Sequence, residues 1–198
     1  MKKMLLVIVG FCIFMQTLAA NEQKILENHF LNKIEEVILI VKDKSLDKTT
    51  RNTHIINVLT PMFDFELMAK LSLGKVWNTL PLDTRKNFLS LYEERMQESY
   101  SSKIDVYSDE KISITEILQP KSNRIEVITN LVSKDDKLEI SYKFYKPQNM
   151  KMNKDKWLIY DVVISGVSIL KTDIAQFREF LQSKNIIELI AQLKLNAQ

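Results

Sequence analysis

The apolar residues of this 198-residue chain change their spacing at Lys111. Before Lys111 they recur every three or four residues, which is typical of amphipathic helices; after it they alternate with polar residues, which is typical of half-buried strands. Helices followed by hairpin-connected strands favour a helical layer packed on one face of a curved antiparallel sheet, an α+β architecture. The pattern predicts helices over 25–41, 55–62, 65–71 and 88–100 and strands over 112–114, 125–129 and 138–144.

The last part of the chain adds one more strand and a helical end. The segment from Trp157 to Ser165 is apolar on both faces apart from Asp161, so we expect both of its faces to be covered. A helix follows from about Asp173 and breaks near Asn185. Because residues 21–198 contain no Ser/Pro/Gly-rich linker and no internal repeat, we expect them to form one domain.

The first twenty residues have the order of a secretory signal peptide. A cationic start, Met1 to Lys3, precedes an apolar run from Met4 to Met15 and a small-residue end at Ala19 and Ala20. The alternative is an uncleaved anchor, but about twelve apolar residues fall short of the ~20 that span a bilayer. We therefore predict that residues 1–20 are removed and that the protein is exported.

Composition excludes several kinds of chemistry. The only cysteine is Cys12, inside the predicted signal peptide, and the only histidines are His29 and His54, so disulfide frameworks, thiol catalysis and zinc sites lack their residues. A net charge of +3 argues against a strongly basic nucleic-acid surface. With few glycines there is no phosphate-binding loop and no nucleophile elbow. We expect no metal, no cofactor and no nucleic-acid partner.

Four polar features could carry function or structure. Asp64 precedes a helical run and is interpreted as its N-cap. Asp161, which strand alternation places on one face with Trp157 and Ile159, is either a buried carboxylate with a structural partner, which we favour, or a general base. His29 and His54 lie on different helices and are expected to be solvated or half-buried. The lysine-rich loop 146–156 could approach anionic headgroups or an acidic partner, or simply be solvated.

Two stretches, about 80 residues apart, carry a resemblance to a known family. Phe63-Asp64-Phe65 with Met68-Ala69, Leu73 to Trp77 and Phe88, and later Trp157 to Val162 running into Gly166-Val167-Ser168 and Phe177, resemble the MlaC family, also called toluene-tolerance or Ttg proteins. The resemblance covers nearly the whole chain after residue 20. Many relatives carry a Tyr-Arg pair soon after the Gly-Val-Ser, where this chain has Asp173 and Ile174, so no role of that arginine carries over.

The resemblance implies a periplasmic phospholipid-binding protein with an NTF2-like fold. Such a protein ferries lipid between an outer-membrane lipoprotein complex and an inner-membrane ABC transporter complex, which maintains outer-membrane lipid asymmetry. Phospholipid is then the cargo, not a cofactor, and the protein is not an enzyme. We expect a diacyl phospholipid.

Apolar side chains of both layers are the candidates to enclose the lipid. Methionine suits irregular ligands, and few polar groups should lie inside. The alternative is that the same residues form a filled core. The candidates are Phe65, Met68, Leu71, Trp77, Phe88, Leu91, Tyr92, Met96, Val127, Ile140, Tyr142, Phe144, Tyr160, Val162 and Val167.

Two other functions remain open on the sequence. One is a small NTF2-like enzyme that uses Asp161 in its pocket, and the other is a periplasmic chaperone or adaptor that binds only protein.

Overall fold

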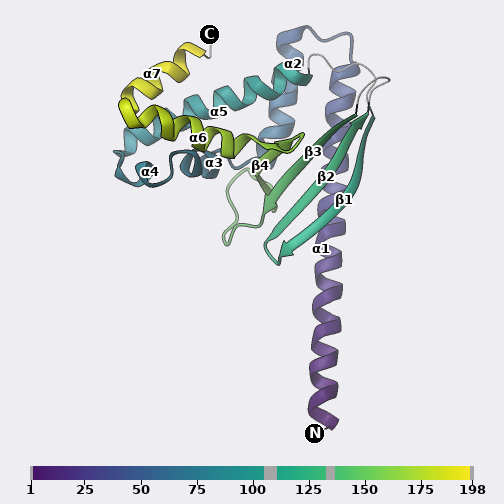
Figure 1. Cartoon of the computed structure of the whole chain (residues 1–198). Helices are drawn as coiled ribbons and strands as arrows, with labels where there is room; N and C mark the ends of the chain where they lie inside the picture. Colours follow the sequence, from purple (N-terminus) through teal and green to yellow (C-terminus); the bar gives the residue numbers. More distant parts are fainter. Residues whose placement is uncertain (1, 105–110, 133–136, 197–198) are drawn as a thin grey trace.

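The computed structural model describes residues 2–104, 111–132 and 137–196. The change of spacing at Lys111 coincides with the start of the first strand, and the predicted order of helices, strands and helices is confirmed (Figure 1). The elements are α1 (Lys2–Lys42), α2 (Lys48–Leu59), the 3-10 turn η1 (Thr60–Met62), α3 (Phe65–Leu73), α4 (Lys75–Thr79), α5 (Leu82–Ile104), β1 (Lys111–Lys121), β2 (Arg124–Val132), β3 (Lys137–Tyr145), β4 (Leu158–Ile164), β5 (Val167–Ser168), α6 (Ile169–Ser183) and α7 (Ile186–Asn196).

The strands form one antiparallel sheet in the order β1-β2-β3-β4-β5. Val127, Tyr142 and Val162 lie opposite one another on neighbouring strands, so their side chains share the face that packs on the helices. Figure 1 shows α1 behind β1–β3 and the later helices gathered beside β4. Phe30 of α1 contacts Tyr142, with ring centroids 4.9 Å apart, which fixes α1 on this face of the sheet. The expected α+β, NTF2-like arrangement is confirmed.

Local side-chain chemistry sets where the helices begin and end. Asp64 accepts a hydrogen bond from the backbone N–H of Leu67 at 3.0 Å, which confirms the predicted N-cap of α3. Gly74 ends α3 with φ of +56°, a conformation that glycine adopts at low cost. Asn185 separates α6 from α7 and caps α7 through the N–H groups of its first turn, as the predicted break requires.

The main core lies where α3, α5 and α6 meet the sheet, and aromatic rings fill it. Phe88 lies 5.8 Å from Phe177 and 5.9 Å from Tyr92, ring centroid to ring centroid. A second, smaller apolar cluster of Val37, Ile55 and Val58 joins α1 to α2. Among the described residues, no helix carries an apolar stretch long enough to cross a membrane.

Candidate lipid-binding cavity

A cavity of about 500 Å³ lies between α1 and the inner face of the sheet. Helix α1 supplies one wall with an apolar stripe at helical spacing, β3 and β4 supply the opposite wall, and η1, α5 and the start of α6 close the sides. The lining residues are Phe30, Ile34, Val37, Ile38, Val41, Leu59, Met62, Phe63, Met96, Ser99, Ile112, Leu131, Leu138, Ile140, Tyr142, Ile159, Val162, Ile164 and Ile169.

The lining is almost entirely hydrocarbon; among the described residues, Ser99 and Tyr142 are its only polar side chains. Burial raises the pKa of Tyr142 to about 12, because no charge or hydrogen bond offsets the desolvation of its phenolate. Tyr142 is nevertheless only half-buried by accessible surface, so that surface faces the cavity and not bulk solvent. A volume of this size with an apolar lining suits an apolar ligand, and no charged side chain lies among the described lining residues.

Four of the candidates named from the sequence lie on the cavity wall: Met96, Ile140, Tyr142 and Val162. Eight lie outside the lining, in or against the filled core, because the helices approach the sheet closely there and the rings interdigitate; these are Phe65, Met68, Trp77, Phe88, Leu91, Tyr92, Val127 and Phe144.

The remaining three candidates lie away from both the cavity and the core. Val167 is 61% exposed and Leu71 is 38% exposed, since each occupies the solvent side of its element. Tyr160 packs edge-on against Tyr145, with Arg124 over both rings. The structure therefore does not bring these three residues together with the four on the cavity wall, and whether each candidate contacts lipid stays a prediction.

Most of the cavity wall on α1 was missed from the sequence. Phe30, Ile34, Val37, Ile38 and Val41 recur at the spacing that predicted the helix, so the signal for an inward apolar stripe was present. That spacing does not distinguish a stripe that faces a cavity from one that faces a packed core.

Asp161 lies outside the cavity, and strand alternation placed it on the wrong face. A register shift between Lys143 and Phe144 sets Lys143 opposite Asp161 and Phe144 opposite Ile159. Such a bulge inserts one extra residue and reverses the alternation beyond it. Ile159 therefore lines the cavity, whereas Asp161 points to the opposite face of β4.

The surroundings of Asp161 agree with the structural role favoured from the sequence. Its carboxylate accepts hydrogen bonds from Ser168 Oγ at 2.8 and 2.9 Å and from the N–H of Leu170 at 3.1 Å, and Lys143 Nζ lies 3.5 Å away. These bonds tie β4 to the first turn of α6, where the helix leaves N–H groups without helical partners. Asp161 thus positions the start of α6.

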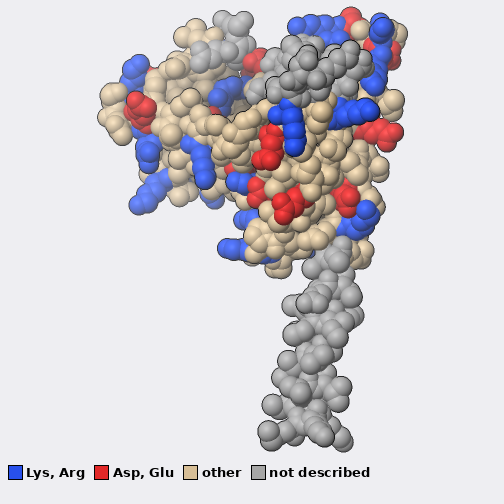
Figure 2. Space-filling view, turned by 45° about the vertical axis from the view of Figure 1, so that its right-hand side comes forward, with Lys and Arg blue, Asp and Glu red and all other residues tan. Residues whose placement is uncertain are grey.

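The lysine-rich loop is held within the chain by ion pairs. Lys151 lies 2.9 Å from Asp64, which also accepts a hydrogen bond from Tyr145. Desolvation and that bond to the carboxylate raise the pKa of Tyr145. Lys154 donates to the carbonyl of Thr60 at 2.7 Å. The loop therefore packs on the start of α3 and on η1. Acidic and basic side chains are interspersed over the face of the molecule that Figure 2 shows.

The same loop binds the described part of α1 at two points. Glu22 accepts hydrogen bonds from Lys156 Nζ at 2.7 Å, Trp157 Nε1 at 3.0 Å and Lys146 Nζ at 3.3 Å. These bonds, that of Lys156 first, lower the pKa of Glu22 to about 2 against the opposing effect of desolvation. Two turns further along α1, half-buried His29 lies 2.7 Å from the carboxylate of Asp155. His54 is exposed. The contacts of Glu22 and His29 with the loop thus hold this part of the cavity-lining helix in place.

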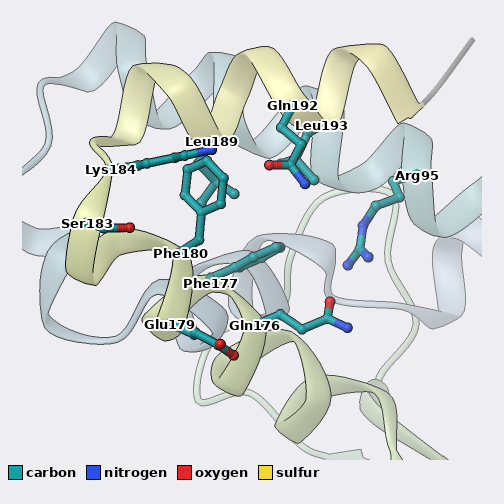
Figure 3. A pocket seen from close by; sticks show the side chains of 10 residues that line it. All are labelled: Arg95, Gln176, Phe177, Glu179, Phe180, Ser183, Lys184, Leu189, Gln192 and Leu193. Carbon is teal, nitrogen blue, oxygen red and sulfur yellow. The ribbon is translucent and has the colours of Figure 1, made fainter.

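A second hollow, of about 530 Å³, lies on the opposite side of the core between α5, α6 and α7 (Figure 3). Its walls combine Phe177, Phe180, Leu189 and Leu193 with polar and charged side chains, so it resembles a surface cleft more than a lipid cavity. Beside it, Asp173 accepts a hydrogen bond from Tyr92 at 2.8 Å and pairs with Arg95 at 2.7 Å. Burial, followed by the Asp173 carboxylate, raises the pKa of Tyr92.

The sequence of this chain matches the model of a known protein family. The family model described as MlaC protein matches residues 32–195. The chain belongs to the MlaC family. Members of this family are lipid-binding transport proteins, not enzymes. Apart from Phe30, the residues that line the cavity lie within the matched range.

This MlaC family member resembles one curated protein in sequence and one solved protein in structure. The chain is 23% identical over 193 residues to the intermembrane phospholipid transport system binding protein MlaC of Haemophilus influenzae, covering 96% of this chain and 89% of that protein. It superposes on a phospholipid-binding protein of Ralstonia solanacearum, solved in complex with a phospholipid, with a TM-score of 0.72 over 86% of this chain and 95% of that one. At 13% identity, the second likeness establishes the fold.

Proposed function

We propose that this protein is a periplasmic phospholipid carrier that moves lipid between an outer-membrane lipoprotein complex and an inner-membrane ABC transporter complex. The observation that carries the proposal is the 500 Å³ cavity, whose lining holds two polar side chains among the residues that the structure describes. The family membership and the predicted signal peptide support it. Lipid asymmetry of the outer membrane would be maintained by this transport.

The energetics of an apolar cavity suit a shuttle without an energy source of its own. Each acyl methylene moved out of water contributes about 0.8 kcal/mol, so a sixteen-carbon chain contributes roughly 12 kcal/mol and spontaneous release into water is negligible. Exchange between a bilayer and a hydrocarbon-lined cavity is close to balanced. Loading and unloading therefore require docked partners, and the direction of transport is set by those partners.

Organic extraction of the purified protein followed by mass spectrometry tests the proposal. We expect phospholipid at close to one per protein, and transfer of labelled phospholipid between two vesicle populations when the protein is added. An extract without lipid and an absence of transfer would contradict the carrier. Small-molecule turnover with an empty extract would favour the enzyme, and binding of unfolded protein alone would favour the chaperone.

The cellular location is tested separately. We expect the mature protein to begin at Ala20 or Asn21 and to be released with the periplasmic fraction. Intact mass that retains residues 1–20, together with recovery in the membrane pellet, would contradict export through a cleaved signal peptide.

A further inference from the structure

We propose that α1 is the wall of the cavity that moves away from the sheet when lipid enters or leaves, and that a polar latch near Glu22 holds it in place. The latch joins Glu22 and His29 of α1 to the segment from Lys146 to Trp157, which connects β3 to β4. This inference rests on the proposed carrier function and names the part of the molecule that moves during lipid exchange.

The latch fastens α1 to the sheet through the ends of two strands. Lys146 directly follows β3 and Trp157 directly precedes β4, and both donate hydrogen bonds to the carboxylate of Glu22. Asp155, which contacts His29 at 2.7 Å, is itself held by a backbone hydrogen bond of 3.1 Å from its N–H to a carbonyl of η1. The sheet side of the latch is therefore fixed, and opening the latch releases α1.

Water can replace the ion pairs of the latch. The charged side chains that form them are all partly exposed; they are Glu22, His29, Lys146, Asp155 and Lys156. Ion pairs in such positions contribute little to stability, because water solvates the separated charges. The latch can thus open at small cost.

Apolar contacts fasten the other end of α1. Val37 packs with Ile55 and Val58 of α2, and residues 43–47 join the two helices. Such contacts resist separation because both apolar surfaces would enter water. Motion of α1 is therefore expected to pivot about its α2 end and to be largest at the latch.

Between these two ends, α1 faces the sheet with apolar side chains. Phe30 contacts the rings of Tyr142 and Phe144, and Ile34 and Ile38 line the cavity. Moving α1 away from the sheet uncovers these side chains, and the acyl chains of an entering lipid cover them again. Hydrocarbon replaces hydrocarbon, so the apolar contacts of α1 oppose the motion less when lipid is present.

A covalent latch tests the proposal. After removal of residues 1–20 the chain contains no cysteine, so Glu22→Cys/Lys156→Cys can be joined by a short bismaleimide once the protein is loaded with fluorescent phosphatidylethanolamine. Transfer of this lipid to vesicles of phosphatidylethanolamine and phosphatidylglycerol is then followed with time. We expect the linked protein to transfer lipid about tenfold more slowly than wild type, and the unlinked variant about threefold faster.

Lys33 and Glu36 provide the matched control, because they form an ion pair within α1 itself. The same link in Lys33→Cys/Glu36→Cys leaves α1 free to move, so the transfer rate should equal that of wild type. Equal rates for the linked latch and this control would overturn the proposed motion while the carrier function stands. Absence of transfer by the wild type would overturn the carrier function itself.

His29→Ala keeps the proposal testable if the double-cysteine variant of the latch does not fold. It removes the contact with Asp155 and leaves those of Glu22 in place. We expect transfer about twofold faster than wild type, with folding confirmed by circular dichroism. An unchanged rate in the folded variant would contradict the latch.

Discussion

The interface between the helices and the sheet consists of two regions that differ in the shape of their side chains. Around Phe88, aromatic rings from α5 and α6 pack closely, and Phe88 meets Phe177 edge to face with ring centroids 5.8 Å apart. Between α1 and β3, mostly aliphatic side chains such as Ile34, Ile38 and Ile140 face each other across about 500 Å³. The same sheet therefore supports a packed core at one end and a ligand cavity at the other.

Side-chain length accounts for part of this difference. Rings reach across the space between layers and interdigitate, whereas branched aliphatic side chains of a distant helix do not. Helix α1 is also attached to the rest of the molecule by polar contacts near Glu22 and by its own small cluster with α2, centred on Ile55. Together with the ring contact between Phe30 and Tyr142, these attachments hold α1 beside the sheet while Ile34 and Ile38 face the cavity.

The largest expected effect comes from removing a ring of the packed region. Phe88 is fully buried among Trp77, Tyr92 and Phe177, so Phe88→Ala leaves a cavity that its neighbours cannot fill. We expect a loss of about 3–5 kcal/mol in the free energy of unfolding, measured by urea denaturation.

A matched substitution in the cavity wall provides the contrast. Leu138 is half-buried and already faces open space, so Leu138→Ala loses fewer contacts. We expect it to cost less than half of the Phe88→Ala value. Equal costs would show that both regions are packed alike and that the cavity closes in solution.

The sequence predicts the structural features that depend on local interactions better than those that depend on contacts between distant segments. The helix boundaries at Asp64, Gly74 and Asn185 could be predicted because capping and backbone freedom are local. The bulge that separates Ile159 from Asp161 could not, since it arises from pairing between β3 and β4. Only four of fifteen candidate lipid residues line the cavity, because periodicity reports which face is apolar and not how far the opposite face lies.

A smaller effect is expected at Asp161, on the face of β4 that the cavity does not use. Asp161→Asn keeps the shape but weakens the bonds to Ser168, Leu170 and Lys143. We expect a loss of about 1–3 kcal/mol in the free energy of unfolding, as for hydrogen bonds to a charged group. Bound phospholipid per folded protein should stay unchanged, and its loss would indicate that β4 transmits a change to the cavity.

A still smaller effect should appear at the attachment of α1. The folded state lowers the pKa of Glu22 from 4.5 to about 2, so its ion pairs stabilise the protein fully above pH 5 and this contribution is lost as the pH falls toward 2. Because Glu22 and its lysines are partly exposed, we expect about 1 kcal/mol. Glu22→Gln should be less stable than wild type at pH 7 by this amount, and the difference should shrink as the pH falls from 5 to 2, measured by thermal unfolding. A constant difference across this range would contradict the assigned pKa.

The smallest effect on stability, and a large effect on lipid, is expected at Ile140 in the centre of the cavity wall. In a packed core, enlarging a side chain to tryptophan costs about 1–3 kcal/mol because neighbours leave their rotamers. Ile140 faces open space, so Ile140→Trp should fold with a melting temperature close to that of the lipid-free wild type. The indole would occupy acyl-chain volume, and we expect bound phospholipid to fall at least fivefold by extraction and mass spectrometry.

Val127→Phe is the matched control, since Val127 is fully buried in the neighbouring strand and outside the cavity lining. It should lower the melting temperature by several degrees and leave lipid per folded protein unchanged. If Ile140→Trp instead melts early and keeps its lipid, Ile140 belongs to the packed region and the boundary between the two regions lies closer to Leu138.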